Sequence, residues 1–313
     1  MRINVRLLAC VGALAVSILG GCEPHAASPS GTGRLFGVSL QTMGNPFFVE
    51  LNNGLKARIE GQGDRLVTLD AQFNSQKQKN DIAGLLRQQP AAIFITPVNW
   101  EGIKEILIEA KRKHVPVLVV DTAVSEPELA LCQVGSDNVE AGRLACEALA
   151  QVRPQAKVVI LHRSVSKSCI DRVAGFKAEM AKHPGMEILD IQEGGGTFEG
   201  ARPVMRDLLA RFPELDAAFP INDLSALGAI SAIESAGRNG QVTVVTVDGS
   251  REGATAILAG KLYATVAQYP REIGRLAAEN AYASLAGRPV EKDLTVPVKL
   301  FTKENAAGLL EPK

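Results

Sequence analysis

The sequence predicts an α/β protein with two doubly wound parallel sheets. Strand-length apolar runs alternate with helix-length amphipathic segments along almost the whole chain. The strands are continuously apolar, which is typical of parallel strands buried on both faces. About ten such units occur, and this number indicates two sheets of the doubly wound type rather than one.

The elements follow one another in a regular order. In the first half, strands are predicted at residues 35–40, 66–69, 92–95, 117–120 and 131–134. Helices are predicted to begin after the first three of these strands and after the fifth, at Pro46, Ser75, Trp100 and near Asn138. In the second half, helical sequence follows each of the strands predicted at residues 158–161, 188–191, 217–221 and 242–245. A single (β/α)₈ barrel is the structural alternative. It ranks second because a further strand, at 264–267, exceeds eight units.

Charge and composition exclude one class of partner. The chain has 313 residues, with 34 Lys or Arg and 34 Asp or Glu, so the formal net charge is +0. No cluster of basic residues forms a stripe, which argues against a nucleic-acid interface. Aromatic residues make up only 4% of the chain, so Ala, Val, Leu and Ile must form the core. Without the leader described next, roughly 290 residues remain, enough for two α/β domains.

The first 33 residues predict export and a lipid anchor. A short basic segment (1–6) precedes an apolar run (7–16) that is shorter than the ~20 residues of a spanning helix. Leu19-Gly20-Gly21-Cys22 then resembles a bacterial lipobox, in which the Cys is diacylated and becomes the mature N-terminus. An ordinary secretory signal with an incidental Cys22 is the alternative. Residues 23–33 have the composition of a flexible tether, so we expect a periplasmic or cell-surface protein held by lipid to a bacterial membrane.

The cysteines and histidines predict neither metal nor cofactor. Beyond Cys10 in the leader and Cys22, the chain has Cys132, Cys146 and Cys169, which allow at most one internal disulfide. None has CxxC or zinc-ligand spacing, and the four His are scattered. We expect buried thiols at the first two positions. Cys169 stands three residues before a candidate site residue, described below.

Four short polar motifs mark a candidate site. Each lies at the C-terminal end of a predicted strand or opens the helix that follows. In open α/β sheets, ligands bind at that edge. Amides, carboxylates, a guanidinium and aromatic rings gathered there suit a small, hydroxyl-rich ligand. The motifs are Asn45-Pro46-Phe47-Phe48, Asp171-Arg172, Asn222-Asp223 and Asp248-Gly249.

In order and spacing, these motifs resemble those of the ribose- and galactose-type periplasmic sugar-binding proteins. The resemblance extends from about Leu35 to Phe301. It implies two Rossmann-like domains joined by a three-segment hinge, with the ligand in the cleft between them. It also implies a monomer that captures a sugar or polyol and delivers it to an ABC permease and its ATPase, without catalysis. The implied lobes comprise residues 34–135 with 269–297 and residues 136–268 with 298–313, with crossings near 135–137, 268–269 and 297–298.

The resemblance assigns roles to residues that follow strands of the first lobe. Asn45 binds a ligand hydroxyl, and Phe47 or Phe48 covers the sugar ring, although one Phe could instead belong to the core. Helix capping is the alternative role of Asn45. Asp121 closes an apolar strand and directs a carboxylate into the cleft. Thr122 follows it where the ribose-type pattern has an Arg.

In the second lobe, Arg172 matches the cleft Arg of the family, and a surface ion pair with Asp171 is its alternative role. Asn222 matches a ligand-binding Asn, followed by a structural Asp. Asp248 matches the second cleft Asp, and its alternative is an Asx turn. Gln268 matches a Gln near a domain crossing. All four side chains are predicted to bind the ligand.

Two departures from the family pattern point away from ribose. Thr122 removes a strong donor. The aromatic residue that many relatives have before the helix leading into Met205 falls on Gly194-Gly195-Gly196, so we expect either Phe198 to replace it or a roomier pocket. Two Asp oppose one Arg in the predicted site, which favours a neutral or weakly polar ligand over a phosphorylated one.

Three other functions compete with transport. A glycoside-processing enzyme would use Asp121 and Asp248 as paired carboxylates, but nothing marks either as a general acid, and Glu199 breaks the dinucleotide pattern G-x-G-x-x-G after Gly194. A sugar-sensing transcription regulator would need an N-terminal helix-turn-helix where this chain has an export signal. A lipid-anchored receptor feeding a chemoreceptor or sensor kinase stays open, because sequence does not separate it from a transport component.

Overall fold

The structure is a computed structural model that describes residues 33–311. The predicted signal peptide, Cys22 and all but the last residue of the predicted tether lie outside the described residues. Within residues 33–311, no helix has both the length and the apolar character needed to cross a bilayer.

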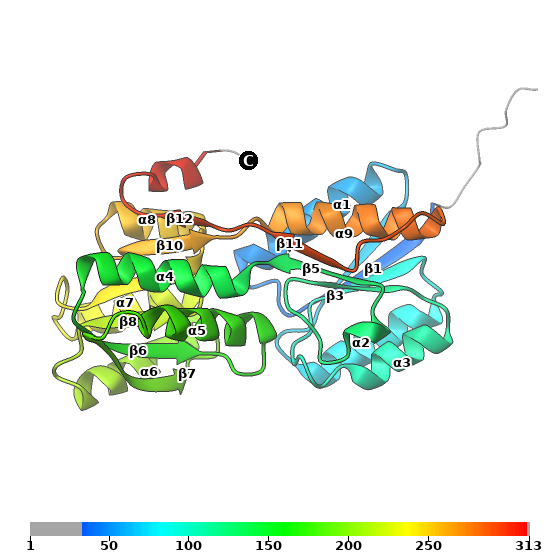
Figure 1. Ribbon diagram of the computed structural model, residues 1–313. Helices are drawn as coiled ribbons and strands as arrows, with labels where there is room; N and C mark the ends of the chain where they lie inside the picture. The colour runs from blue at the N-terminus through cyan, green and yellow to red at the C-terminus, as the bar shows by residue number, and fades with distance from the viewer. Residues whose placement is uncertain (1–32, 312–313) are drawn as a thin grey trace, which may run out of the picture. The chain divides into compact units, whose positions relative to one another are not determined.

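The first sheet has six strands, all paired in parallel, in the order β11-β5-β4-β3-β1-β2. Helices α1 (Pro46–Glu60) and α9 (Pro270–Leu285) cover one face, and α2 (Ser75–Arg87) and α3 (Lys104–Arg112) cover the other (Figure 1). We call this sheet and its helices the first lobe. Its strands are β1 (Leu35–Leu40), β2 (Arg65–Asp70), β3 (Ala92–Ile95), β4 (Val117–Val120), β5 (Cys132–Ser136) and β11 (Asp293–Val296).

The second sheet also has six strands, in the order β12-β10-β9-β8-β6-β7, and only β12 is antiparallel to its neighbour. On one face lie α4 (Asn138–Val152) and α5 (Lys167–Met180), and on the other α6 (Phe198–Arg211), α7 (Asp223–Ser235) and α8 (Arg251–Leu258). We call this sheet and its helices the second lobe. Its strands are β6 (Ala156–His162), β7 (Met186–Glu193), β8 (Ala217–Pro220), β9 (Thr243–Asp248), β10 (Ala264–Ala267) and β12 (Lys299–Phe301). Two short 3₁₀ helices span Pro127–Leu129 and Ala306–Leu309.

The strands are buried because helices cover both faces of each sheet. All residues of β3, β4, β8 and β10 are buried. Alternate side chains of one strand enter different cores: Phe94 packs with the α1 and α9 side, and Ile93 and Ile95 with the α2 and α3 side. A continuously apolar strand is therefore what a parallel sheet between two helical layers requires.

The prediction of two doubly wound sheets is confirmed, and the barrel alternative is wrong because the strands form two separate sheets. The chain passes between the sheets three times: from β5 into α4, from β10 into α9, and from β11 to β12. The short edge strands β11 and β12 carry no apolar run, which is why the sequence did not indicate them.

One helix begins later than predicted. The helix expected from Trp100 begins at Lys104. Ahead of it, the side-chain oxygen of Asn99 accepts a hydrogen bond from the backbone N–H of Glu101 at 3.0 Å. Such a side-chain bond stabilises a turn in competition with helix, so residues 98–103 form turns at the carboxyl edge of the first sheet.

Candidate functional site

A central cavity lies at the carboxyl-terminal edges of both sheets, where ligands bind in open α/β folds. Its volume is about 40 Å³. Residues from both lobes line it, because the parallel strands β1, β4, β6, β8, β9 and β10 all end there. The lining residues are Gln41, Asn45, Phe47, Phe48, Phe73, Asp121, Arg163, Ser166, Ser168, Cys169, Arg172, Gly196, Ile221, Asn222, Asp248 and Gln268.

The structure brings most of the predicted site residues to this cavity. The predicted residues that line it are spread over the chain from Asn45 to Gln268, so they are distant in sequence but adjacent in space. Two predicted residues do not line it, Thr122 and Phe198. Those that do are Asn45, Phe47, Phe48, Asp121, Arg172, Asn222, Asp248 and Gln268.

Asn45 and the two Phe residues form the wall contributed by α1. The Asn45 Oδ1 accepts a hydrogen bond from the Phe47 backbone N–H at 2.9 Å, so Asn45 caps α1 and also borders the cavity. The rings of Phe47 and Phe48 meet edge to face with centroids 5.3 Å apart. Both rings are buried, and both belong to the core of the first lobe as well as to the cavity wall.

Arg172 is fixed by three partners inside the second lobe. Its Nε donates to Asn138 Oδ1 and its Nη1 to the Ile221 carbonyl oxygen, each at 2.8 Å. Nη1 also lies 3.6 Å from Asp248 Oδ1. Asp171 instead pairs with Lys167 on the same helix. The surface ion pair between Asp171 and Arg172 is therefore absent, and the Arg172 side chain, 4% exposed, is held among its partners in the second lobe.

Asp248 and Gln268 form a hydrogen-bonded pair beside Arg172. Gln268 Nε2 donates to Asp248 Oδ1 at 2.7 Å, and Gln268 Oε1 is buried without a partner in the described structure. Asp248 has φ 138°, a region that residues with side chains rarely adopt. No Asx turn forms here, because the Ser250 N–H donates to Asp223 at 2.7 Å instead. Backbone strain of this kind clusters at functional sites.

Asp223 and Asn222 hold the loop structure around the cavity. Asp223 also accepts a hydrogen bond from Thr265 Oγ1 at 2.8 Å, and Thr265 in turn accepts one from the Gly249 N–H at 3.1 Å. Asn222 Nδ2 donates to the Gly196 carbonyl oxygen at 2.9 Å, and its Oδ1 accepts from the Ser225 N–H at 3.0 Å. Asn222 thus caps α7 as well as lining the cavity, and Asp223 has a structural role.

Asp121 differs from Asp248 because its carboxylate accepts no hydrogen bond from residues 33–311. It also has a positive φ, 71°. Burial raises the pKa of Asp121 to about 6, although the positive charge of Arg172 opposes this shift. Burial likewise raises the pKa values of Asp248 and Asp223, and the negative charge of Asp248 adds to the effect on Asp223. Carboxylates with raised pKa values are frequent at functional sites.

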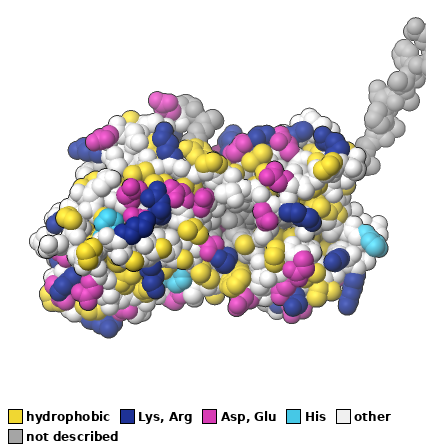
Figure 2. All heavy atoms as spheres, in the orientation of Figure 1, with side chains coloured by type: hydrophobic (Ala, Val, Ile, Leu, Met, Phe, Trp, Pro, Cys, Tyr) yellow, Lys and Arg dark blue, Asp and Glu magenta, His cyan; other side chains and the backbone are white. Residues whose placement is uncertain are grey.

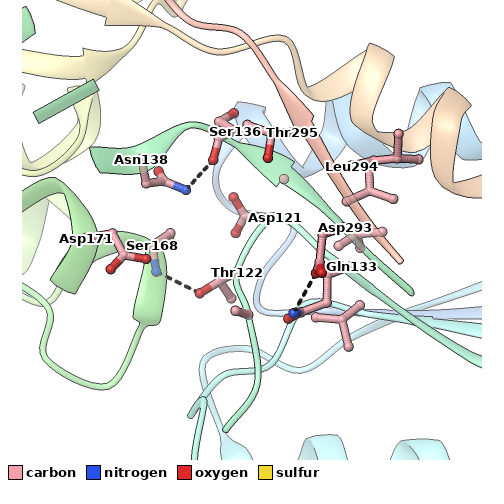
Figure 3. Close-up of a pocket in the computed structure, with 15 residues that line it drawn as sticks. Asp121, Thr122, Gln133, Ser136, Asn138, Ser168, Asp171, Asp293, Leu294 and Thr295 are labelled. Atoms are coloured by element: carbon pink, nitrogen blue, oxygen red, sulfur yellow. Dashed lines mark hydrogen bonds between the residues drawn. The ribbon is translucent and has the colours of Figure 1, made fainter. Parts of the chain in front are cut away.

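Thr122 lies behind the cavity rather than in it. Its Oγ1 accepts a hydrogen bond from the Ser168 N–H at 3.0 Å and lies 3.3 Å from Ser166 Oγ, so it joins the two lobes. It lines a second hollow of about 130 Å³, the crossing pocket, beside the passage from β5 to α4. Asp121 borders both hollows. Figure 3 shows its carboxylate among Thr122, Ser136, Asn138 and Thr295.

Phe198 lies outside the central cavity. It is the first residue of α6, after the cap Thr197, and its backbone packs against Gly228 of α7. It lines a surface hollow together with Arg202, Pro203 and other residues of α6 and α7. The structure therefore does not place Phe198 where it could replace the missing aromatic, because the helix cap directs it away from the sheet edge.

Several cavity residues were missed by the sequence analysis. Arg163 directly follows β6, so its place after a strand was a signal that went unused. Phe73 lies in the loop between β2 and α2 with φ 55°. The Cζ of Arg163 is 4.3 Å from the centroid of the Phe73 ring. The others are Gln41, Ser166, Ser168, Gly196 and Ile221, together with Cys169, which the sequence had marked by its spacing from Arg172.

The three cysteines of the described chain are free and buried, so no disulfide joins them. Burial raises the pKa of each thiol, to about 11 for Cys132 and about 12 for Cys146. Such thiols are poor nucleophiles. Among residues 33–311, no group of three or more His, Cys, Asp or Glu side chains is arranged to hold a metal ion.

Comparisons with known proteins agree on one family. A profile described as periplasmic binding protein domain matches residues 36–289. The ribose import binding protein of Bacillus subtilis is 31% identical, over 93% of this chain and 97% of its own length. The xylitol-binding protein of Mycolicibacterium smegmatis is 27% identical, over 98% and 88%. Among solved structures, the periplasmic binding protein of the arabinose ABC transporter of Shewanella sp. ANA-3, bound to arabinofuranose, has a TM-score of 0.83 and 30% identity, over 88% and 93%.

Proposed function

This chain belongs to the periplasmic binding protein family, and from that premise we propose that it captures a neutral monosaccharide or polyol outside the cytoplasm and delivers it to an ABC-type importer. Relatives named for ribose, xylitol and arabinose support this class of ligand. The observation that carries the proposal is the central cavity, in which carboxylates, amides and aromatic rings from both lobes meet.

The polar groups of the cavity match a hydroxyl-rich ligand. Gln268 Oε1 is a buried acceptor without a partner in the described structure, and only the charge of Arg172, with no hydrogen bond, offsets the burial of the Asp121 carboxylate. A ligand hydroxyl can donate to either. The rings of Phe47 and Phe48 can cover an apolar face of a sugar. A site built of such groups rejects a ligand that leaves them unpaired.

The charge of the cavity favours a neutral ligand. Asp121 and Asp248 stand against Arg172 and Arg163, so the lining carries no net positive charge for a phosphate. Outside the cavity, Figure 2 shows side chains of both signs mixed over the visible face. Neither the cavity nor that face offers the concentrated basic surface that an anionic ligand or nucleic acid requires.

We infer that the lobes part to admit the ligand and close around it. Most of the residues that line the cavity are buried, which supports opening of the lobes during uptake. Contacts from both lobes favour the closed form, since only differential binding shifts such an equilibrium. We assign the hinge to the three crossings near residues 135–137, 268–269 and 297–298, with lobes of residues 34–135 with 269–297 and 136–268 with 298–313.

We further propose that Cys22 anchors a monomer to the membrane by lipid, on the sequence of residues 19–22 alone. The mature protein is then expected in the detergent phase on partitioning, and Cys22→Ser in the aqueous phase. An unmodified N-terminus at any other residue, found by mass spectrometry, contradicts this anchor. A permease and its ATPase are the proposed partners.

Calorimetry tests the proposed ligand class directly. The protein is titrated with ribose, arabinose, fructose, xylitol and ribose 5-phosphate. We expect micromolar or tighter binding, about −8 kcal/mol or more favourable, for at least one neutral member and none for the phosphate ester. Binding of the phosphate ester alone, or of no neutral member, contradicts the proposal.

A further inference from the structure

Arg163 reaches from the second lobe to the first along one wall of the central cavity. Its Nη1 donates to the Gly195 carbonyl oxygen at 3.1 Å within its own lobe. Its Nη2 donates to the Val98 carbonyl oxygen of the first lobe at 3.4 Å, and its guanidinium lies over the Phe73 ring of that lobe, with Cζ 4.3 Å from the centroid. A guanidinium over an aromatic face is an attractive contact, so this side chain links the lobes.

Arg163 also fills space beside Gly196. A Cβ built on Gly196 would lie 3.4 Å from Arg163 Cδ and 3.6 Å from Asn222 Nδ2. The stretch at Gly194–Gly196 is where the sequence lacks the aromatic expected from the family pattern. The structure supplies a ring to the cavity from Phe73, in the opposite lobe, and packs the stem of Arg163 against the glycine. Phe73 of the first lobe and Arg163 of the second lobe therefore form this part of the cavity wall together.

The Arg163 guanidinium is not fully satisfied by the protein. Its Nε is buried and has no hydrogen-bond partner in the described structure. Burial lowers the pKa of Arg163, as expected for a charge with reduced hydration. A buried donor without an acceptor is costly. Because Arg163 lines the cavity, a ligand oxygen can satisfy this donor once the walls adjust to the ligand.

We infer that Arg163 is a specificity-determining residue, which, seated on Phe73, donates a hydrogen bond to one oxygen of the bound sugar or polyol. This inference rests on the proposed function and adds an orientation to it. Ligand hydroxyls that donate face Asp121 and the Gln268 side, and an accepting hydroxyl or ring oxygen faces Arg163. The contact forms fully only when the lobes meet, so it contributes to closure as well as selection.

Arg163→Met tests the inference because it keeps the stem and removes every donor. In the full mature protein, calorimetry is run with the tightest-binding member of the ribose, arabinose, fructose and xylitol panel and with its single-deoxy analogues. The wild type is expected to bind one of the deoxy analogues, the one that lacks the oxygen facing Arg163, about tenfold or more weakly than the parent ligand. Arg163→Met is expected to bind the parent ligand more weakly than the wild type by a similar factor. It should bind the parent ligand and that deoxy analogue with equal affinity.

Arg211→Met is the matched control, since Arg211 also lies over an aromatic ring, that of Phe212 at 4.8 Å, but outside the cavity. It should leave unchanged both the affinity for the parent ligand and the relative affinities for the deoxy analogues (the deoxy pattern). Melting curves check that both variants fold. If Arg163→Met folds and keeps both the affinity and the deoxy pattern of the wild type, while Arg172→Ala loses binding, the inference is wrong and the proposed function stands. If the wild type binds no panel member, both fail.

Discussion

The two lobes contribute walls of different character to the same cavity. In the second lobe, Arg172, Asp248 and Gln268 are joined to one another or to backbone by hydrogen bonds and an ion pair. In the first lobe, Phe47 and Phe48 present rings, and Asp121 presents a carboxylate without a hydrogen-bond donor from the described residues. A hydrogen-bonded polar wall thus faces a wall with aromatic rings and an unpaired carboxylate, and we therefore propose that the second lobe orients the ligand and the first closes over it.

The largest effect is expected for Arg172→Ala. This change leaves Asp248 buried without its cation and releases Asn138, so binding should weaken by about 2–5 kcal/mol. The melting temperature should also fall, because breaking a buried ion pair is strongly destabilising. Calorimetry and thermal melting measure the two effects. Arg206→Ala, which removes an exposed pair with Asp207, is the control. Unchanged affinity in the Arg172 variant places the ligand elsewhere.

Asp121→Asn and Asp248→Asn should separate the two walls. Asp248 has partners to lose, so its variant should lose both ligand affinity and thermal stability. Burial raises the pKa of both carboxyls, but Asp121 has no hydrogen-bonded partner in the described structure, so its variant should keep or gain stability while affinity falls by about tenfold. Equal loss of stability in both variants, measured by denaturant unfolding, refutes the difference between the walls.

Acid should act in opposite directions on stability and on binding. Asp121 has a pKa of about 6 in the folded protein against an ordinary value of 3.8, so the folded state holds the proton more tightly. The unfavourable contribution of its charge is therefore present above pH 6 and disappears as the pH falls towards 4. Ligand affinity should drop over the same range, because a protonated carboxyl is a weaker acceptor for a hydroxyl.

The comparison of wild type with Asp121→Asn isolates this effect. Between pH 8 and pH 5 the stability of the wild type should rise relative to that of the variant, and the variant should lose less affinity to acid. Parallel curves for the two proteins contradict the assignment to Asp121.

The smallest effect is expected at the apolar wall. Phe47→Leu keeps most of the core packing but removes the aromatic face, so affinity should fall by about 0.5–1.5 kcal/mol. Calorimetry with the tightest-binding neutral sugar measures the change, and Phe212→Leu, outside the cavity, is the control. A loss as large as that of Arg172→Ala shows that stacking, rather than the polar wall, dominates binding.

The sequence predicted the parts of the site that follow from sheet geometry. Parallel strands end at one edge of their sheet, so Asn222 and Asp248, at the ends of neighbouring strands of the second sheet, had to lie close together. Asp121 ends a strand of the first sheet, and its place beside them depends on how the two lobes face each other. Arg163 also follows a strand, but its significance depends on Phe73 and Val98 of the other lobe, which no local pattern connects to it.

Helix caps and edge strands marked the other limits of prediction. Thr197 caps α6 and places Phe198 on the helix, away from the cavity. Asn99 holds a turn where periodicity favoured helix. The strand Asp293–Val296 is short and partly polar, as an edge strand can be, so it lacks the apolar run that identified its neighbours.

Small-angle scattering of the mature protein, with and without its tightest-binding neutral sugar or polyol, measures whether the two lobes close around the ligand. If both lobes clasp the ligand, the radius of gyration falls on saturation in the wild type and stays constant in Arg172→Ala at the same ligand concentration. A wild-type protein that binds the ligand tightly, as shown by calorimetry, but keeps the same scattering curve contradicts the account.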